Sequence, residues 1–248
     1  MKKKIFITII LFIFSYYYTY KCITFLKQND YLMQEIIDKQ ELYNKEPINA
    51  IITNNTMIPG VNGRKINLDE SYNKMKKLNK FNDSLLSYDE IKPTIFIKDN
   101  YNKIIISGNK MKNNISIILI INEDELFYSL NKILIINNVY ANILSNKKYN
   151  INNTNYINIV NTNYSSNIDY CLTYELQIKN DCITNKKYTI LGRNIHNYHF
   201  TNTKEIIDNG SILVYSFNKS NYQDLNIIIK YLKNNNYNIV SIQELIKE

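Results

Sequence analysis

Residue types that most catalytic motifs require are scarce in this chain. It contains five glycines, two histidines and three cysteines in 248 residues. A phosphate-binding loop and a hydrolase nucleophile elbow both need closely spaced glycines, and neither pattern is present. No cysteine and histidine form a recognisable pair of nucleophile and base. The scarcity therefore argues against a nucleotide-binding enzyme and against a serine or cysteine hydrolase.

Arginine is also scarce, and this affects how the net charge is interpreted. Arg64 and Arg193 are the two arginines among 30 basic residues, and isoleucine, asparagine, lysine and tyrosine dominate, a bias that AT-rich codons alone would produce. The formal net charge is +8, but five of the lysines lie within the first 27 residues. From residue 28 onward 25 basic residues accompany 22 acidic ones, so this part carries +3. A nucleic-acid-binding role therefore loses its main electrostatic argument.

Residues 1–27 predict a membrane anchor. Three lysines precede the run Ile5–Phe25, which is aliphatic at first and rich in tyrosine afterwards. Positive charge before the run favours a cytoplasmic N-terminus, and the tyrosines suit the opposite membrane interface. No small-x-small cleavage site follows, so we prefer an uncleaved anchor to a signal peptide. The sequence thus predicts a single-pass cell-membrane protein with an extracellular C-terminal domain.

The next two segments predict small elements before the main domain. In residues 28–47, apolar residues recur at loosely helical spacing among charges as far as Pro47, which predicts a helical stalk. Residues 48–110 predict a small α+β satellite. It contains a helix that begins near Asp69 and two strand candidates, Thr94–Lys98 and Lys103–Ser107.

Residues 111–248 predict an α/β domain in which short apolar runs alternate with amphipathic stretches. The strand candidates are Ile115–Ile121, Val139–Leu144, Tyr156–Val160, Ile168–Cys171, Tyr188–Leu191, Ser211–Phe217 and Asn238–Val240. The helix candidates are Glu123–Ile136, Glu175–Thr184, Thr203–Asn209 and Tyr222–Asn235, and Ser241 with Glu244 predicts a capping box. Strands that are apolar throughout favour parallel pairing with both faces buried. Seven such units fit a barrel better than an open sheet.

The cysteines leave two alternatives. Cys22 lies in the predicted anchor, whereas Cys171 and Cys182 lie eleven residues apart in the main domain. We interpret the latter two as buried free thiols, and a disulfide is the alternative if a turn or helix brings them together.

Two stretches resemble the membrane-anchored polysaccharide deacetylases of low-GC Gram-positive bacteria, the family with the chitooligosaccharide-deacetylase homology domain. The first stretch, Met57–Leu86, reads MIPGVNGRKINLDESYNKMKKLNKFNDSLL and is similar to the segment that precedes the catalytic domain. The second, Asn209–Ile246, reads NGSILVYSFNKSNYQDLNIIIKYLKNNNYNIVSIQELI and is similar to the last two units of that domain. The resemblance implies a distorted (β/α)7 barrel in residues 111–248.

The same resemblance implies a metal site whose residues can be sought here. In the family one aspartate and two histidines hold a divalent metal, a second aspartate is the base, and a late histidine is the acid. The chain has Ile120 and Ile121 where the aspartates are expected, Thr162 and Ser166 at the histidines, and Ser216 at the acid. Since every position is substituted, the resemblance implies a degenerate member without catalytic residues, metal or other cofactor.

Two other groups of residues are candidate replacements for the missing site. His196 and His199 could share a helical face and a metal, but they fall in a predicted loop without an obvious third ligand. We interpret them as a solvated pair. Glu123, Asp124 and Glu125 follow the first strand, and we interpret them as the N-terminal turn of a helix, where carboxylates are favourable.

We therefore predict a membrane-anchored, extracellular, deacetylase-like pseudoenzyme of the cell envelope, with cell-wall glycan as its partner and no nucleic acid. Two alternatives stay open. One is an envelope protein-interaction module without glycan affinity. The other is an enzyme that hydrolyses C–N bonds of N-acetyl groups with a rearranged metal site at His196 and His199.

Overall fold

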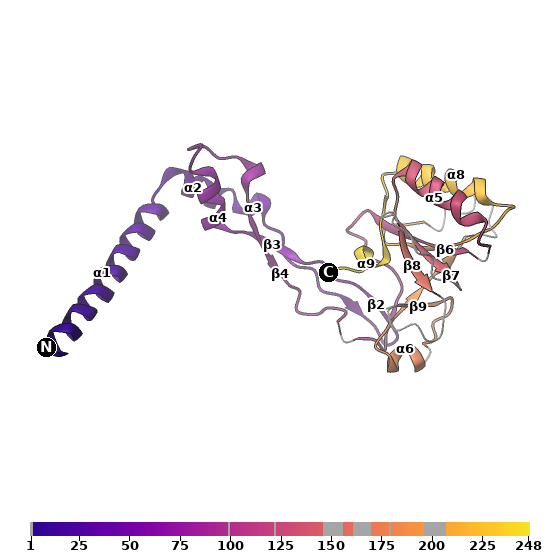
Figure 1. Ribbon diagram of the computed structural model, residues 1–248, viewed down its shortest axis with the longest axis horizontal. Helices are drawn as coiled ribbons and strands as arrows, with labels where there is room; N and C mark the ends of the chain where they lie inside the picture. The colour runs from indigo at the N-terminus through magenta and orange to yellow at the C-terminus, as the bar shows by residue number, and fades with distance from the viewer. Residues whose placement is uncertain are drawn as a thin grey trace. The chain divides into compact units, whose positions relative to one another are not determined.

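The computed structural model describes residues 2–98, 100–121, 123–145, 156–160, 170–178, 180–195 and 207–248 (Figure 1). The chain forms two compact units, and each is built from discontinuous segments. Unit 1 comprises residues 1–47 and 62–92, and unit 2 comprises residues 48–61 and 93–248. This division differs from the expected one, because both ends of the expected satellite, residues 48–61 and 93–110, belong to the unit that holds the large sheets.

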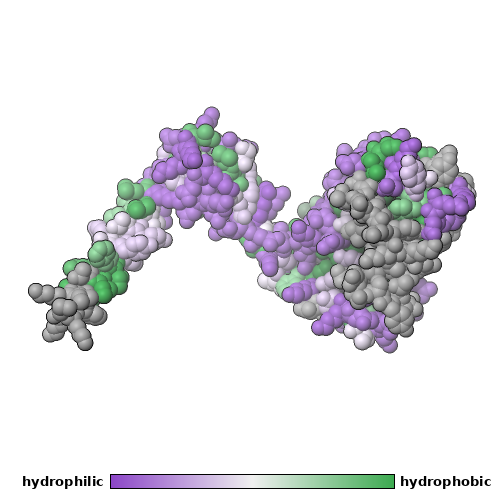
Figure 2. Space-filling view, in the orientation of Figure 1, coloured by the Kyte–Doolittle hydropathy of each residue, from purple (hydrophilic) through white to green (hydrophobic). Residues whose placement is uncertain are grey.

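Unit 1 begins with the predicted anchor. Helix α1 (Lys2–Gln28) is followed by α2 (Tyr31–Asp38), α3 (Gln40–Tyr43), β3 (Gly63–Ile66), α4 (Leu68–Met75), a short 3-10 turn, η1 (Asp83–Leu85), and β4 (Tyr88–Ile91). Strands β3 and β4 pair antiparallel. Within α1, the segment Ile9–Gln28 is long and apolar enough to cross a membrane. Figure 2 shows green and near-white residues along α1, whereas purple dominates the rest of unit 1.

The segment expected to be a stalk is part of a folded core instead. Leu32, Met33 and Ile36 of α2 are buried against Tyr72 and Met75 of α4. The apolar residues at helical spacing are therefore covered by a second helix rather than exposed along a stalk. Two side-chain bonds of Asp30 fix the start of α2, since its carboxylate accepts the Leu32 amide at 2.9 Å and the Tyr72 hydroxyl at 3.0 Å.

Unit 2 contains two sheets, and all but one of their strand pairs are parallel. One sheet has the order β1 (Ile51–Ile52), β2 (Thr56–Ile58), β5 (Ile104–Ile105), β10 (Tyr188–Leu191), β9 (Tyr170–Thr173). The other has the order β11 (Arg193–Asn194), β12 (Ile212–Phe217), β6 (Asn114–Ile121), β7 (Ala141–Ser145), β8 (Tyr156–Val160), and β13 (Asn238–Ile239) also pairs with β6. Only β1 and β2 pair antiparallel among the strands described in this unit. The predicted parallel pairing is confirmed.

The seven strands expected in residues 111–248 correspond to β6, β7, β8, β9, β10, β12 and β13. Gly192 separates β10 from β11, which pair with strands of different sheets, so residues 188–194 connect the two. The described strands do not close into a complete ring. The structure thus confirms an α/β fold with parallel strands and leaves barrel closure as a prediction.

Helices cover the larger sheet, which explains its continuous apolar runs. Leucines and isoleucines of α5 (Leu126–Asn137) and α8 (Tyr222–Asn234) pack on the face of β6 and β12 that carries Leu119 and Leu213. The opposite face carries Ile118 and Val214 and packs against α9 (Ile242–Leu245) and the smaller sheet. In Figure 1, α5 and α8 lie side by side over one end of unit 2. Both faces of β6 are therefore buried.

Two local predictions in unit 2 have different outcomes. The Ser241 hydroxyl accepts a hydrogen bond from the Glu244 amide at 3.1 Å, which confirms Ser241 as the N-cap of α9 and one of the two bonds of the expected capping box. Thr94–Lys98 is not a strand, so that prediction is wrong. Side chains, rather than a neighbouring strand, accept the hydrogen bonds of its backbone amides. The Asn49 side chain accepts hydrogen bonds from the amides of Thr94 and Ile95. The Glu248 carboxylate accepts one from the Ile97 amide.

Cys171 and Cys182 form a disulfide, so the preferred interpretation as free thiols is wrong. Helix α6 (Asn180–Thr184) returns to β9 and brings the two Cα atoms to 6.2 Å. This lies within the range that a disulfide spans. Cys22 is the free cysteine and is exposed on α1.

A tight turn precedes β12. Gly210 has φ +84°, and a Cβ there would lie 2.4 Å from the carbonyl oxygen of Gly108. In the same turn Asp208 accepts hydrogen bonds from Lys110 at 2.9 Å and from Ser211 at 2.7 Å, and Arg193 lies 3.5 Å away. The expected helix Thr203–Asn209 lies largely outside the described residues, and its described part, residues 207–209, is not helical.

Candidate functional site

The carboxyl ends of β6, β7 and β12 meet at one edge of the larger sheet. Ile120 pairs with Ser216 on one side and with Leu144 on the other, and Ile121 is aligned with Phe217 and Ser145. In parallel α/β proteins ligands bind at this edge. Three of the five positions identified from the resemblance, Ile120, Ile121 and Ser216, therefore lie side by side where a site would be expected.

The side chains at this edge are mostly apolar. Ile121 and Phe217 are buried, and Ile120 is partly buried. Ser216 contributes a hydroxyl group that is only partly exposed, and a serine hydroxyl does not release a proton as an acid at neutral pH. None of the three described positions offers a carboxylate or an imidazole, so they supply neither the aspartate and histidine ligands nor the acid and base that the resemblance implies.

Hydrogen bonds with the turn that follows β12 fix the backbone at Ser216. The Asn221 side chain donates to the Ser216 carbonyl oxygen at 2.7 Å, and the Tyr215 hydroxyl donates to the Asn221 carbonyl oxygen at 2.8 Å. Burial and the nearby Asp224 charge raise the pKa of the Tyr215 phenol well above its usual value, so it remains a proton donor. These bonds fix the end of β12 without adding a reactive group.

The acidic residues near this edge are paired with a lysine. The Lys219 ammonium nitrogen lies 3.0 Å from a Glu125 oxygen and 3.4 Å from a Glu123 oxygen. The hydrogen bond and negative charge of Glu125, followed by those of Glu123, raise the pKa of the Lys219 ammonium group. The cluster joins the loop after β12 to the loop after β6. Helix α5 begins at Leu126, so Glu123, Asp124 and Glu125 precede its first turn rather than forming it, and the Glu125 side chain does not cap the helix. Within the described ranges, no three histidine, cysteine or carboxylate side chains are placed to hold a metal ion.

The other predicted site residues cannot be placed. Thr162, Ser166, His196 and His199 lie outside the described residues. The preceding strand, β8, is described as far as Val160, which pairs with Ser145 of β7.

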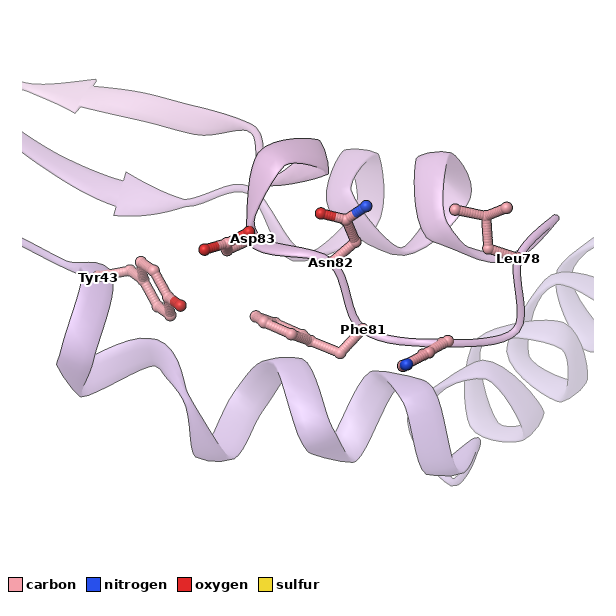
Figure 3. A pocket seen from close by; sticks show the side chains of 6 residues that line it. Tyr43, Leu78, Phe81, Asn82 and Asp83 are labelled. Atoms are coloured by element: carbon pink, nitrogen blue, oxygen red, sulfur yellow. The ribbon is translucent and has the colours of Figure 1, made fainter.

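An open groove in unit 1 was not predicted from the sequence. Its volume is about 570 Å³, and it is lined by Tyr43, Leu78, Lys80, Phe81, Asn82 and Asp83 (Figure 3). Phe81 points toward Tyr43, with ring centroids 6.2 Å apart, and the Lys39 ammonium nitrogen lies 3.8 Å from the Phe81 ring centroid. The only sequence signal was that residues 78–83 belong to the first stretch that resembles the deacetylases. Among the described residues that line the groove, no cluster of titratable groups points to catalysis.

Comparison with known proteins supports the fold. No protein-family profile matches the chain. The chain is 35% identical over 91 residues to the uncharacterised protein YlxY of Bacillus subtilis, and this match covers 36% of the chain but only 28% of the relative.

The similarity to solved structures extends much further along the chain. The wild-type BA3943 protein of Bacillus anthracis is described as a pseudoenzyme of carbohydrate esterase family 4. The BA3943 structure superposes on this chain with a TM-score of 0.63 at 21% sequence identity. The match covers 88% of this chain and 95% of the BA3943 chain. A BA3943 mutant described as having restored enzymatic activity superposes with the same TM-score at 20% identity and covers 88% and 98%. This chain therefore shares the α/β fold of carbohydrate esterase family 4.

Proposed function

We propose that this chain is a membrane-anchored, extracellular member of the polysaccharide deacetylase group that has lost its chemistry and binds cell-wall glycan. The single observation that carries the proposal is the apolar edge formed by Ile120, Ile121 and Ser216. These three positions lie together, yet none of them carries the carboxylate or imidazole that the metal and acid–base chemistry of the deacetylases uses. A retained scaffold with a substituted site is what we expect of a protein that kept its shape after losing turnover. Shape alone does not give function, so the glycan partner is the part that needs a direct test.

Two features support the location. The segment Ile9–Gln28 has the length and hydropathy of a membrane span, and lysines precede it. The Cys171–Cys182 disulfide is of a kind that persists in oxidising compartments and is rare in the cytosol. Together they favour an anchor with unit 2 outside the cell.

The complete barrel belongs to the same proposal. Pairing runs continuously from β8 through β7, β6 and β12 to residues 188–194 and then to β9. Contact between β8 and β9 would complete the ring. An experimental structure in which these two strands are separated by other elements would refute a barrel.

Loss of activity is tested with the purified protein and N-acetylated chito-oligosaccharides in the presence of zinc, cobalt or manganese. We expect no acetate release. Turnover that disappears on His196→Ala or His199→Ala would instead establish the rearranged site. As a second test, Ile120→Asp, Ile121→Asp, Thr162→His, Ser166→His and Ser216→His are combined, and any gain of metal-dependent acetate release supports the position of the former site.

Glycan binding is tested by cosedimentation with purified peptidoglycan. We expect the protein to be retained, and its complete recovery in the supernatant would refute this part of the proposal. The orientation is tested with protease added to intact protoplasts, which should remove everything beyond about residue 30. A protected C-terminus would contradict an extracellular domain.

A protein-interaction module is the second candidate, and the outer face of α5 favours it. Tyr128, Ile135 and Ile136 are exposed there although they are apolar or aromatic. Exposed apolar groups of this kind are common at protein interfaces. Capture of a membrane partner that depends on Ile135 and Ile136, together with no retention on peptidoglycan, would select this candidate.

A further inference from the structure

The end of α4 and the loop that follows it in unit 1 are unusually basic. Residues 71–82 include Lys74, Lys76, Lys77 and Lys80 and no acidic residue. Lys74 is paired with Glu70, at 2.9 Å. The other three lysines are exposed, and no carboxylate in the described part of the chain forms an ion pair with them. Their charge is therefore available to a partner.

This loop and the end of α1 meet at one aromatic ring. The Lys27 ammonium nitrogen lies 4.9 Å from the Tyr72 ring centroid, and that of Lys76 lies 5.5 Å from the same centroid. Lys27 also pairs with Asp69 at 2.6 Å, so the last turn of α1 is fixed against α4. The loop therefore starts at the level where α1 leaves its apolar span.

Exposed apolar groups accompany the lysines at this level. Leu78 follows Lys77 directly and is 60% exposed, and Tyr31, three residues after α1 ends, is 83% exposed. Figure 3 shows that Leu78 and Phe81 lie on the same loop, where Phe81 points to Tyr43 and Leu78 lies at the opposite end of the groove. A leucine and a tyrosine among lysines have the composition of segments that rest in a lipid headgroup layer.

We propose that Tyr31, Lys76, Lys77, Leu78 and Lys80 form a lysine face that rests on the anionic lipid surface in which α1 is anchored. Each lysine near such a surface strengthens binding by about fivefold, and its methylene stem lies along the apolar layer while the ammonium group remains at the phosphates. Leu78 and Tyr31 enter the lipid headgroup layer and determine how deeply the lysine face lies in it. The lysine face orients unit 1 against the membrane, and the proposal rests on the anchor in the proposed function.

The absence of tryptophan from the chain allows a direct test of depth, because each Leu78→Trp molecule carries a single tryptophan. The full chain is reconstituted into bilayers of phosphatidylcholine, with or without phosphatidylglycerol, that contain brominated acyl chains. We expect about twofold quenching of Leu78→Trp in the anionic bilayer and little in the neutral one. Adding Lys76→Gln and Lys77→Gln, or raising salt to about 1 M, should remove the quenching.

Two other positions serve as controls. Phe14→Trp lies within α1 and should be quenched in both bilayers, whereas Met111→Trp, at a residue of unit 2 that is 78% exposed, should be quenched in neither. If Phe14→Trp is quenched but Leu78→Trp is not, the lysine face does not touch lipid and the inference is overturned while the anchor stands. The inference would also be overturned if quenching of Leu78→Trp did not depend on the lipid charge or on the lysine substitutions. An unquenched Phe14→Trp would refute the anchor itself.

Discussion

Removing the Cys171–Cys182 disulfide should destabilise unit 2 by an amount that the chain length between the cysteines sets. The bond closes a loop with a sequence separation of eleven residues between β9 and α6. Loop-closure entropy for this length corresponds to a stabilisation of about 3 kcal/mol at 25 °C. We expect the double variant Cys171→Ser, Cys182→Ala to lose this amount, where alanine avoids placing a hydroxyl group at the buried position 182.

Urea denaturation followed by circular dichroism measures the loss. With a slope of about 2–3 kcal/mol per molar urea, the midpoint should fall by about 1 M. Cys22→Ser is the matched control, because Cys22 is exposed on α1 and outside unit 2, and its midpoint should not change. Without reductant, iodoacetamide should label one thiol in the unfolded wild-type chain. Labelling of three thiols, or an unchanged midpoint in the double variant, would refute the disulfide and the stability argued from it.

Three further predictions concern the fold of unit 2. Gly210→Ala should lower stability by about 2–4 kcal/mol, because a residue with a Cβ disfavours the positive φ and the added carbon meets a backbone oxygen; an unchanged melting temperature would contradict the turn. Partial burial opposes ionisation of Asp208, but bonds from Lys110 and Ser211 and the charges of Lys110 and Arg193 outweigh it and lower the pKa below the usual 3.8. Since the folded state then binds fewer protons than the unfolded chain, Asp208 stabilises the fold above its unfolded pKa, and this contribution is lost as the pH falls through the folded pKa. Asp208→Asn should therefore flatten the dependence of the melting temperature on pH below about pH 4, and a profile identical to wild type would refute its role. Asn142 is fully buried and forms hydrogen bonds with Ser116, Ile117 and the Ile242 amide, so Asn142→Ala should cost about 3 kcal/mol in urea titration; a change below about 0.5 kcal/mol would contradict this network.

The strands of the main domain were predictable because a strand that is buried on both faces is apolar at nearly every position. Ile115–Ile121 is apolar at nearly every position, and β6 is indeed covered on one face by α5 and α8 and on the other by α9 and the smaller sheet. The cap at Ser241 was predictable for a similar reason, since it depends on residues within one helical turn. The three apolar or hydroxylic residues at the sheet edge were identified from resemblance and position along the strands, and parallel registration placed them together.

Interactions between distant segments could not be derived in this way. A pattern of apolar residues at helical spacing shows that α2 must bury one face, but not that α4 would cover it. Strand propensity in Thr94–Lys98 did not reveal that Asn49 and Glu248 would take its amides.

By itself, the sequence determined the apolar segment of α1 and the apolar strands of the main domain, because these features depend on local composition and period. The residues at the sheet edge were identified from the resemblance to the deacetylases. Only the tertiary structure decided the division into two discontinuous units, the pairing of Cys171 with Cys182 and the ion pairs of Lys219 with Glu123 and Glu125. Each of these requires chain segments to meet in space. Their proximity is set by how strands and helices pack, and spacing along the sequence does not encode it.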